Sequence, residues 1–151
     1  MHRRRFERYG VRIYEVKAMS NGFNHLELDL NKKTILIVDD EVVILSLLRD
    51  ILDMLGYNVV LCLSPEEALE VFTHDRMYID LIIMDMMMPG MNGLQLYRRI
   101  CQVDSNNKVI LLSGYSMVHV TAQLLEEGVV GFVQKPVTIK KLDEAIQKAL
   151  S

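Results

Sequence analysis

The chain has 151 residues, of which 50% are hydrophobic, so it is long enough to form one globular domain with its own core. The formal net charge is −3, and no apolar run approaches the roughly 20 residues that a membrane-spanning helix needs. The basic residues near the N-terminus are not followed by the apolar stretch of a secretory signal peptide. We therefore expect a cytoplasmic protein without membrane insertion.

The charge is unevenly distributed along the chain. Residues 1–33 carry eight Lys or Arg against four Asp or Glu, a net of +4, and the remainder carries nine against sixteen, a net of −7. An acidic main body argues against a nucleic-acid surface, so we expect no direct DNA binding. Cys62 and Cys101 lie in apolar patterns without the spacing of a metal site, which indicates free thiols.

Residues 1–32 precede the regular pattern and are predicted to form an N-terminal extension. Segments 11–19 and 23–30 both have strand character, and 26–30 alternates strictly between apolar and acidic residues. Asn21-Gly22 between them is a strong turn signal, so we predict a β-hairpin within 11–30. An isolated hairpin is only marginally stable in water and has to pack on something. The sequence leaves open whether this is the edge of an upstream domain, an appended segment or a dimerisation arm.

From residue 34 onward, short apolar runs alternate with amphipathic segments, which is typical of repeated βα units. Strands are predicted at 34–38, 58–63, 80–84, 108–112 and 131–134. Helices are predicted at 42–55, 65–74, 93–101, 118–127 and 138–150. Right-handed crossovers between such units give an α/β fold, a doubly wound five-stranded parallel sheet with helices on both faces.

Four of the predicted strands end in polar residues, and these are Asp39-Asp40, Asp85, Ser113 and Lys135. The carboxyl ends of parallel strands lie at one edge of the sheet, where open α/β folds bind ligands. Three carboxylates held together repel one another, and a divalent cation relieves that repulsion. Since no His or Cys joins the group, the oxygen ligands suit Mg²⁺ or Mn²⁺ better than zinc.

The surroundings of Asp85 point to phosphoryl transfer. Asp85 opens a loop, so we expect one of its carboxylate oxygens to remain free as a nucleophile. Attack on a phosphoryl group needs positive charge near the equatorial oxygens, which the cation and Lys135 would supply, and Ser113 would donate a hydrogen bond. The simpler interpretations are that Asp39 or Asp40 caps the following helix, and that Lys135 is a solvated loop residue.

Four segments, in this order and spacing, resemble motifs of the receiver domain of two-component response regulators. They are Ile-Leu-Ile-Val-Asp-Asp-Glu at 35–41, Ile-Ile-Met-Asp-Met-Met-Met-Pro-Gly-Met-Asn-Gly at 82–93, Leu-Leu-Ser-Gly-Tyr at 111–115 and Gly-Phe-Val-Gln-Lys-Pro at 131–136. The resemblance implies that 33–151 is a receiver domain with a flavodoxin-like sheet of strand order 2-1-3-4-5 and five helices. It also implies a phosphorylation-dependent signalling switch.

The resemblance further implies a separate role for each acidic residue of the site. Asp85 would be the phosphoacceptor. Asp40 would bind Mg²⁺ directly, and Asp39 directly or through water. Asp85 and the backbone carbonyl of Met87 would complete the protein's share of the metal ligands, and Mn²⁺ would substitute for Mg²⁺.

Three further positions would read out the phosphorylation. Lys135 would bridge to the phosphoryl group, and Ser113 would be the switch hydroxyl. Phe132 would be the switch aromatic, which turns inward when Ser113 is drawn to the phosphate. Many relatives have tyrosine at this position, so the phenylalanine excludes any readout through a phenolic hydroxyl.

The family also implies partners. A histidine kinase or a histidine phosphotransfer protein would donate the phosphoryl group, and the downstream target is a protein that the sequence does not identify. The face formed by segments 118–127, 131–134 and 138–150 would bind that partner or a second copy. No output domain is expected after the last residue, and the chain would be either a stand-alone regulator or the receiver part of a hybrid sensor histidine kinase. Because it would change only its own phosphorylation state, we expect it not to be an enzyme.

Two alternative functions share parts of this pattern. A phosphatase of the haloacid dehalogenase type also uses an aspartate nucleophile with Mg²⁺ but needs a second aspartate two residues later, where this chain has Met87. A phosphorylation-silent interaction module would have the same fold. The complete set of acidic, hydroxyl and lysine residues argues against it, and only a chemical test separates the two.

Overall fold

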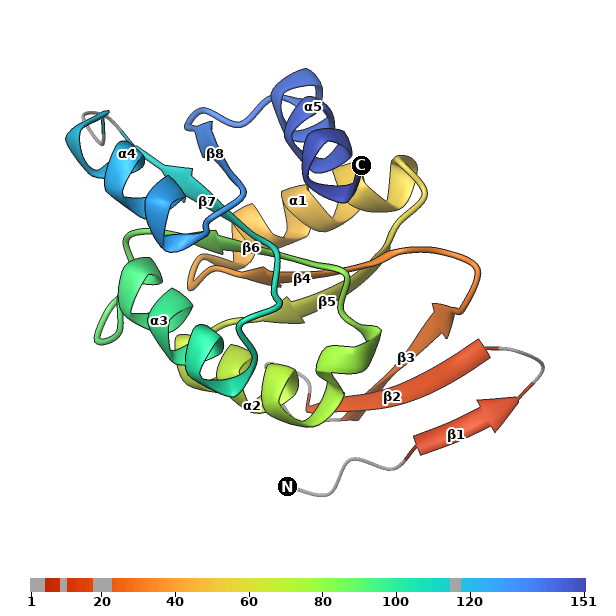
Figure 1. Ribbon diagram of the computed structural model, residues 1–151. Helices are drawn as coiled ribbons and strands as arrows, with labels where there is room; N and C mark the ends of the chain where they lie inside the picture. The colour runs from red at the N-terminus through yellow and green to blue at the C-terminus, as the bar shows by residue number, and fades with distance from the viewer. Residues whose placement is uncertain (1–4, 9–10, 18–22, 115–117) are drawn as a thin grey trace.

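The computed structural model describes residues 5–8, 11–17, 23–114 and 118–151 (Figure 1). It contains a three-stranded sheet of order β1-β2-β3 and a five-stranded sheet of order β5-β4-β6-β7-β8. The first comprises β1 (Arg5–Arg8), β2 (Val11–Lys17) and β3 (Phe23–Asp29). The second comprises β4 (Thr34–Val38), β5 (Asn58–Cys62), β6 (Leu81–Asp85), β7 (Val109–Ser113) and β8 (Gly131–Gln134).

The five strands of the larger sheet are all parallel, and their order is the predicted 2-1-3-4-5 of a flavodoxin-like fold. The connecting helices are α1 (Val42–Met54), α2 (Pro65–Asp75), α3 (Gly93–Val103), α4 (Val118–Glu127) and α5 (Ile139–Leu150). A short 3-10 helix, η1 (Arg76–Tyr78), follows α2. Among the described residues, no helix combines the length and apolar character that crossing a membrane requires.

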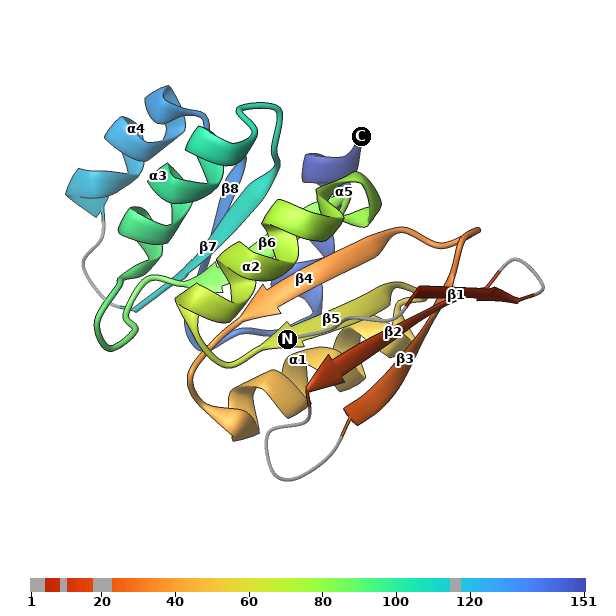
Figure 2. The ribbon, with the colours of Figure 1, turned by 90° about the horizontal axis from the view of Figure 1, so that it is seen from below.

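Both faces of the parallel sheet are covered, because successive residues of each strand point to opposite sides. On one face, Ile35 and Ile37 pack with the buried residues of α1 and α5. On the other, Leu36 and Val38 pack with those of α2, α3 and α4. Figures 1 and 2 show the two helical layers. The double burial explains why these strands are continuous apolar runs in the sequence.

The boundaries of β6 and β7 differ slightly from the prediction. Each begins and ends one residue later than expected, so Asp85 and Ser113 are the last residues of their strands rather than the first residues of loops. Asp85 still pairs with Leu112 in the neighbouring strand. Both polar side chains are therefore held by sheet backbone, which fixes their positions more firmly than a loop would.

The N-terminal segment forms more structure than predicted. Strands β2 and β3 pair antiparallel from Val11↔Asp29 to Lys17↔Phe23, which confirms the hairpin, while the Asn21-Gly22 turn lies outside the described residues. Strand β1, which was not predicted, pairs with β2. Figure 2 shows this sheet beside β5, separate from the parallel sheet.

Residues 28–34, which we call the joint, connect the two sheets at the amino end of the parallel strands. Leu28 is 3% exposed and belongs to the core on the α2 side. The side chain of Asn58, at the start of β5, donates to the carbonyl of Asp29 (2.7 Å) and accepts from its N–H (3.0 Å). It also donates to Oγ1 of Thr34 (3.2 Å). Asn58 thus binds the joint at Asp29 and again at Thr34.

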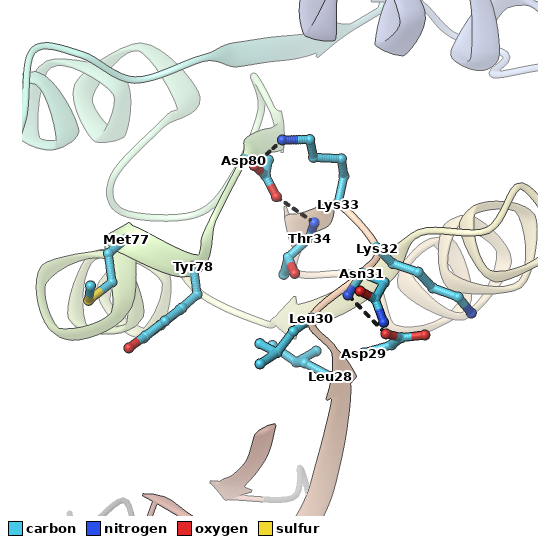
Figure 3. Close-up of a pocket in the computed structure, with 10 residues that line it drawn as sticks. All are labelled: Leu28, Asp29, Leu30, Asn31, Lys32, Lys33, Thr34, Met77, Tyr78 and Asp80. Carbon is cyan, nitrogen blue, oxygen red and sulfur yellow. Dashed lines mark hydrogen bonds and ion pairs between the residues drawn. The ribbon is translucent and has the colours of Figure 1, made fainter. Parts of the chain in front are cut away.

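Asp80 holds the other end of the joint. Its carboxylate accepts the backbone N–H of Thr34 (2.8 Å) and pairs with Nζ of Lys33 (3.1 Å) (Figure 3). A pocket of about 350 Å³ lies between the joint and η1, where Tyr78 faces Leu28 across it. This pocket lies at the opposite end of the sheet from the predicted carboxylate cluster.

Candidate functional site

The three predicted carboxylates come together at the carboxyl end of the parallel sheet. Asp39 and Asp40 follow β4, and Asp85 ends the adjacent strand β6. One oxygen from each of the three lies within 4.8 Å of the others, which makes them a group that could hold a metal ion. Asp39 and Asp85 are buried and Asp40 is exposed, so the cluster opens to solvent on one side.

Asp39 is the most enclosed member of the cluster. Its Oδ1 accepts the backbone N–H of Glu41 (2.9 Å), whereas its Oδ2 is buried without a hydrogen-bond partner. Burial raises the pKa of Asp39 above its ordinary value, and the charges of Asp85 and Asp40 add to the rise. The Glu41 N–H and the charge of Lys135 oppose the rise without cancelling it.

This arrangement fits a hard divalent cation. A buried carboxylate oxygen without a partner, next to two further carboxylates, costs free energy that a cation would recover. Oxygen donors with open positions for water and phosphate are the ligands that Mg²⁺ prefers. The helix-cap interpretation does not account for the pair, because α1 has Glu41 as its N-cap residue and neither aspartate occupies that position.

Both carboxylate oxygens of Asp85 have partners. Oδ2 pairs with Nζ of Lys135 (3.0 Å), and Oδ1 accepts the backbone N–H of Met87 (3.2 Å). The prediction that one oxygen would be free is therefore wrong for this structure. The side chain of Asp85 is 4% exposed and that of Lys135 is 31% exposed, so Lys135 is a partner of a buried carboxylate rather than a solvated loop residue.

Lys135 reaches Asp85 from a position that the sheet determines. Its backbone N–H donates to the carbonyl of Ser113 (2.8 Å), which ties the end of β8 to the end of β7. The peptide bond that follows, to Pro136, is cis. Ser113 itself is buried at the end of β7, between the strands that carry Asp85 and Lys135.

The two remaining predicted positions lie at the border of this group. Phe132, on β8, is partly buried and packs against the core on the α2 and α3 face. Met87 is 75% exposed as a residue, and its backbone N–H already donates to Asp85. The roles of the Met87 carbonyl and the Phe132 ring stay predictions.

Gly93 is a site residue that the sequence did not single out. A Cβ at this position would lie 2.5 Å from the backbone oxygen of Asp85 and 2.9 Å from Cα of Met86. The N–H of Gly93 donates to the carbonyl of Met86 (3.0 Å). Asn92 and Gln95 form a capping box, so α3 begins directly against the strand that carries Asp85. The signal in the sequence was Asn92 with Gln95 three residues later, which is the spacing of a capping box.

Comparison with known proteins identifies the family. Residues 35–147 match the model of the response regulator receiver domain. The chain is 32% identical over 121 residues to sporulation initiation phosphotransferase F of Bacillus subtilis (strain 168), covering 80% of this chain and 95% of that protein. It is 35% identical over 116 residues to the transcriptional regulatory protein GlrR of Escherichia coli (strain K12), covering 77% of this chain but only 26% of that protein.

Solved structures agree with the sequence comparison. A response regulator receiver domain protein from Clostridium thermocellum superposes with a TM-score of 0.75 at 33% identity, covering 78% of this chain and 94% of that one. A chain from the CheX-CheY-BeF3-Mg complex of Borrelia burgdorferi gives a TM-score of 0.75 at 27% identity, covering 79% and 90%. On the family match, the sheet order and these relatives, the chain belongs to the response regulator receiver domain family, whose members are phosphorylation-dependent signalling switches.

Proposed function

We propose that the chain accepts a phosphoryl group on Asp85 and passes the resulting change in conformation to a protein partner. The observation that carries the proposal is the environment of Asp85. It is a buried carboxylate at a strand end, paired with Lys135 at 3.0 Å and grouped with Asp39 and Asp40. Among the polar groups of the described residues, this combination of nucleophile, cation and metal-binding oxygens suits phosphoryl transfer.

In the proposed reaction, a carboxylate oxygen of Asp85 attacks the phosphorus atom of a phosphohistidine. The P–N bond breaks, its electron pair goes to the imidazole nitrogen, and an acyl phosphate remains on Asp85. Nζ of Lys135 moves its hydrogen bond from the carboxylate to a phosphoryl oxygen, where it balances the transferred charge. In the reset step, water attacks phosphorus, the bond to the carboxylate oxygen breaks, and inorganic phosphate leaves.

Asp39, Asp40, Asp85 and the Met87 carbonyl would hold Mg²⁺ at this site, and Mn²⁺ would substitute. The cation would supply positive charge to the phosphoryl oxygens as they approach. The orphan Oδ2 of Asp39 supports this assignment, since nothing else in the described part of the chain satisfies it.

The readout that we propose runs through β7 and β8. Ser113 ends the strand between the one that carries Asp85 and the one that precedes Lys135, which supports a switch role in which its hydroxyl is drawn toward a phosphoryl group. The movement would change the packing of Phe132 and the position of α4. The surface of α4, β8 and α5 would then bind the downstream protein or a second copy of the chain.

The donor that we propose is a histidine kinase or a histidine phosphotransfer protein, in line with the resemblance to a sporulation initiation phosphotransferase of Bacillus subtilis. We place the reaction in the cytoplasm, where the thiols of Cys62 and Cys101 would stay reduced. The chain turns over no external substrate in this scheme and would not be an enzyme in the usual sense.

The test is the intact mass of the protein after incubation with acetyl phosphate and Mg²⁺. We expect one added phosphoryl group that requires Mg²⁺ and is absent from Asp85→Asn. Asp53→Asn is the matched control, because it neutralises an exposed aspartate in the last turn of α1, far from the carboxylate cluster. It should be phosphorylated like the unaltered chain.

Two results would contradict the proposal. An adduct that persists in Asp85→Asn would place the phosphoryl group elsewhere. No adduct, together with no change in thermal stability on addition of beryllofluoride and Mg²⁺, would identify a phosphorylation-silent module.

A further inference from the structure

The C-terminal end of α4 is bound to α3 by two contacts at one residue. The hydroxyl of Tyr97, a buried residue of α3, donates to the backbone carbonyl of Glu127 (2.8 Å). The next residue, Arg98, holds the Glu127 carboxylate with two nitrogens, Nη2 at 3.1 Å and Nε at 3.3 Å. The fork geometry of the guanidinium fixes the direction as well as the distance of this end of α4.

The helix end itself has a fixed backbone. Gly128 has φ +110, its N–H donates to the carbonyl of Leu125, and the N–H of Val129 donates to the carbonyl of Leu124. This is a Schellman ending, in which Leu124 and Val129 make the accompanying apolar contact, and both are buried. A Cβ on Gly128 would lie 2.9 Å from the hydroxyl oxygen of Tyr97, and the positive φ itself favours glycine at this position.

Helix α3 is in turn fixed relative to Asp85. Gly93, its first residue, lies against the backbone oxygen of Asp85 with no room for a Cβ and bonds the Met86 carbonyl. Asp85 is therefore connected to Glu127 in two steps. Gly93 packs α3 against the strand of Asp85, and Tyr97 and Arg98 bind the same helix to Glu127. The first turn of α4 comes after β7, whose last residue is Ser113, and Val120 in that turn packs against the core.

We propose that α4 responds to phosphorylation by tilting about its C-terminal end at 124–129, and that Tyr97 and Arg98 are positioning residues that create this pivot. The inference rests on the proposed function, since it describes how α4 moves after phosphorylation of Asp85. A helix whose C-terminal end is held by α3, and whose N-terminal end comes after the strand that carries Ser113, changes its direction without sliding when Ser113 moves. Of the two contacts, the partly buried hydrogen bond of Tyr97 contributes more than the ion pair of Arg98, whose side chain is exposed.

Peptide-resolved amide hydrogen exchange, with and without beryllofluoride and Mg²⁺, tests the pivot. In the unaltered chain we expect the phosphoryl analogue to change exchange in 118–123 and to leave 124–129 unchanged. In Tyr97→Phe with Arg98→Ala, the change should extend into 124–129, and basal exchange there should be about tenfold faster, which corresponds to about 1.4 kcal/mol. Tyr97→Phe alone keeps the buried ring and gives the same readout if the double variant folds poorly.

Arg99→Ala is the matched control, because it removes the neighbouring exposed arginine of α3 and leaves Arg98 in place. It should reproduce the unaltered pattern. An analogue-dependent change that runs evenly through 118–129 in the unaltered chain would overturn the pivot while leaving the switch standing. An unaltered pattern in the Tyr97 and Arg98 variants would overturn the role of these two residues. No analogue-dependent change in any peptide would overturn the proposed function and the pivot together.

Discussion

At the residue scale, the fold buries a carboxylate oxygen of Asp39 without a hydrogen-bond partner. The contribution of this carboxyl group to the free energy of unfolding depends on pH. The raised pKa of Asp39 means that the folded state binds a proton at pH values where the unfolded chain, with a pKa near 3.8, has lost it. Below about pH 3.8 both states are protonated and the carboxyl group imposes no electrostatic cost. As the pH rises from about 3.8 through the raised pKa of the folded state, the buried carboxyl group has to ionise and the folded state loses stability relative to the unfolded chain.

Asp39→Asn should therefore stabilise the metal-free protein at pH 7, by roughly 1 kcal/mol, because the buried charge is removed. The gain should shrink as the pH approaches 4. Thermal denaturation in EDTA across this range measures it, and millimolar Mg²⁺ should reverse the ranking, since the variant lacks one metal-binding oxygen. If Asp39→Asn were less stable than the unaltered chain in EDTA at pH 7, the buried carboxylate would not destabilise the metal-free protein, and the prediction would be wrong.

Lys135→Met keeps an unbranched apolar chain as long as the aliphatic part of lysine, but it leaves the buried carboxylate of Asp85 without its cation. We expect a loss of about 1–2 kcal/mol in the free energy of unfolding, less than for a fully buried pair because the lysine is partly exposed. The rate of phosphorylation by acetyl phosphate should fall by at least about tenfold, since one stabilising charge is lost. Urea denaturation and intact-mass kinetics measure the two effects. Lys140→Met, at an exposed position of α5, should change neither.

At the scale of elements, the contact between α3 and β6 sets the geometry of the site. Gly93→Ala places a methyl group 2.5 Å from the backbone oxygen of Asp85, and backbone atoms cannot move aside as a flexible side chain would. Alanine would favour the helix by up to about 1 kcal/mol, but we expect the clash to prevail with a net loss of about 1–3 kcal/mol. Phosphorylation should slow as well.

Chemical denaturation and the acetyl phosphate reaction would measure both effects of Gly93→Ala. The matched control is Gly114→Ala, where a Cβ would meet nothing within 4 Å, and its stability should be unchanged. If the two substitutions had equal effects on stability, the close approach of α3 to β6 would not be the cause.

The sequence predicted the five parallel strands well because each is buried on both faces, so Ile35–Val38 and its counterparts are unbroken apolar runs. It placed the ends of β6 and β7 one residue early, because Asp85 and Ser113 are polar yet still pair within the sheet. Strand β1 was missed because Arg5-Phe6-Glu7-Arg8 has four residues and a single apolar one, which leaves no alternation to detect.

The residues of the site were predicted from their places at strand ends, and their partners were not. That Lys135 would occupy one oxygen of Asp85, and the Met87 N–H the other, depends on side-chain directions that spacing does not encode. Tyr97 and its bond to Glu127 join positions 30 residues apart. A tyrosine on an apolar helix face indicates burial, but nothing local names the carbonyl that it reaches.

At the scale of the whole molecule, Asn58 is one of the residues that attach the N-terminal sheet to the domain. Asn58→Ala would leave the N–H and carbonyl of Asp29 without their partner, at a cost of about 1–3 kcal/mol. We expect a lower urea midpoint and faster limited proteolysis N-terminal to residue 28, while phosphorylation of Asp85 continues. Asn106→Ala, at an exposed loop position, serves as the control. Equal proteolysis of both variants would mean that other contacts hold the joint.

The joint and the last turn of α5 both lie at the amino end of the parallel sheet, where Nζ of Lys108 donates to the Ala149 carbonyl (2.8 Å) just before β7. The carboxylates lie at the other end, beyond a five-residue strand that spans about 15 Å. A sensor chip that captures the protein through Ser151, or through a tag on its N-terminal sheet, would therefore leave the acidic cluster facing the solution. Donor proteins injected over either surface should bind with the same affinity.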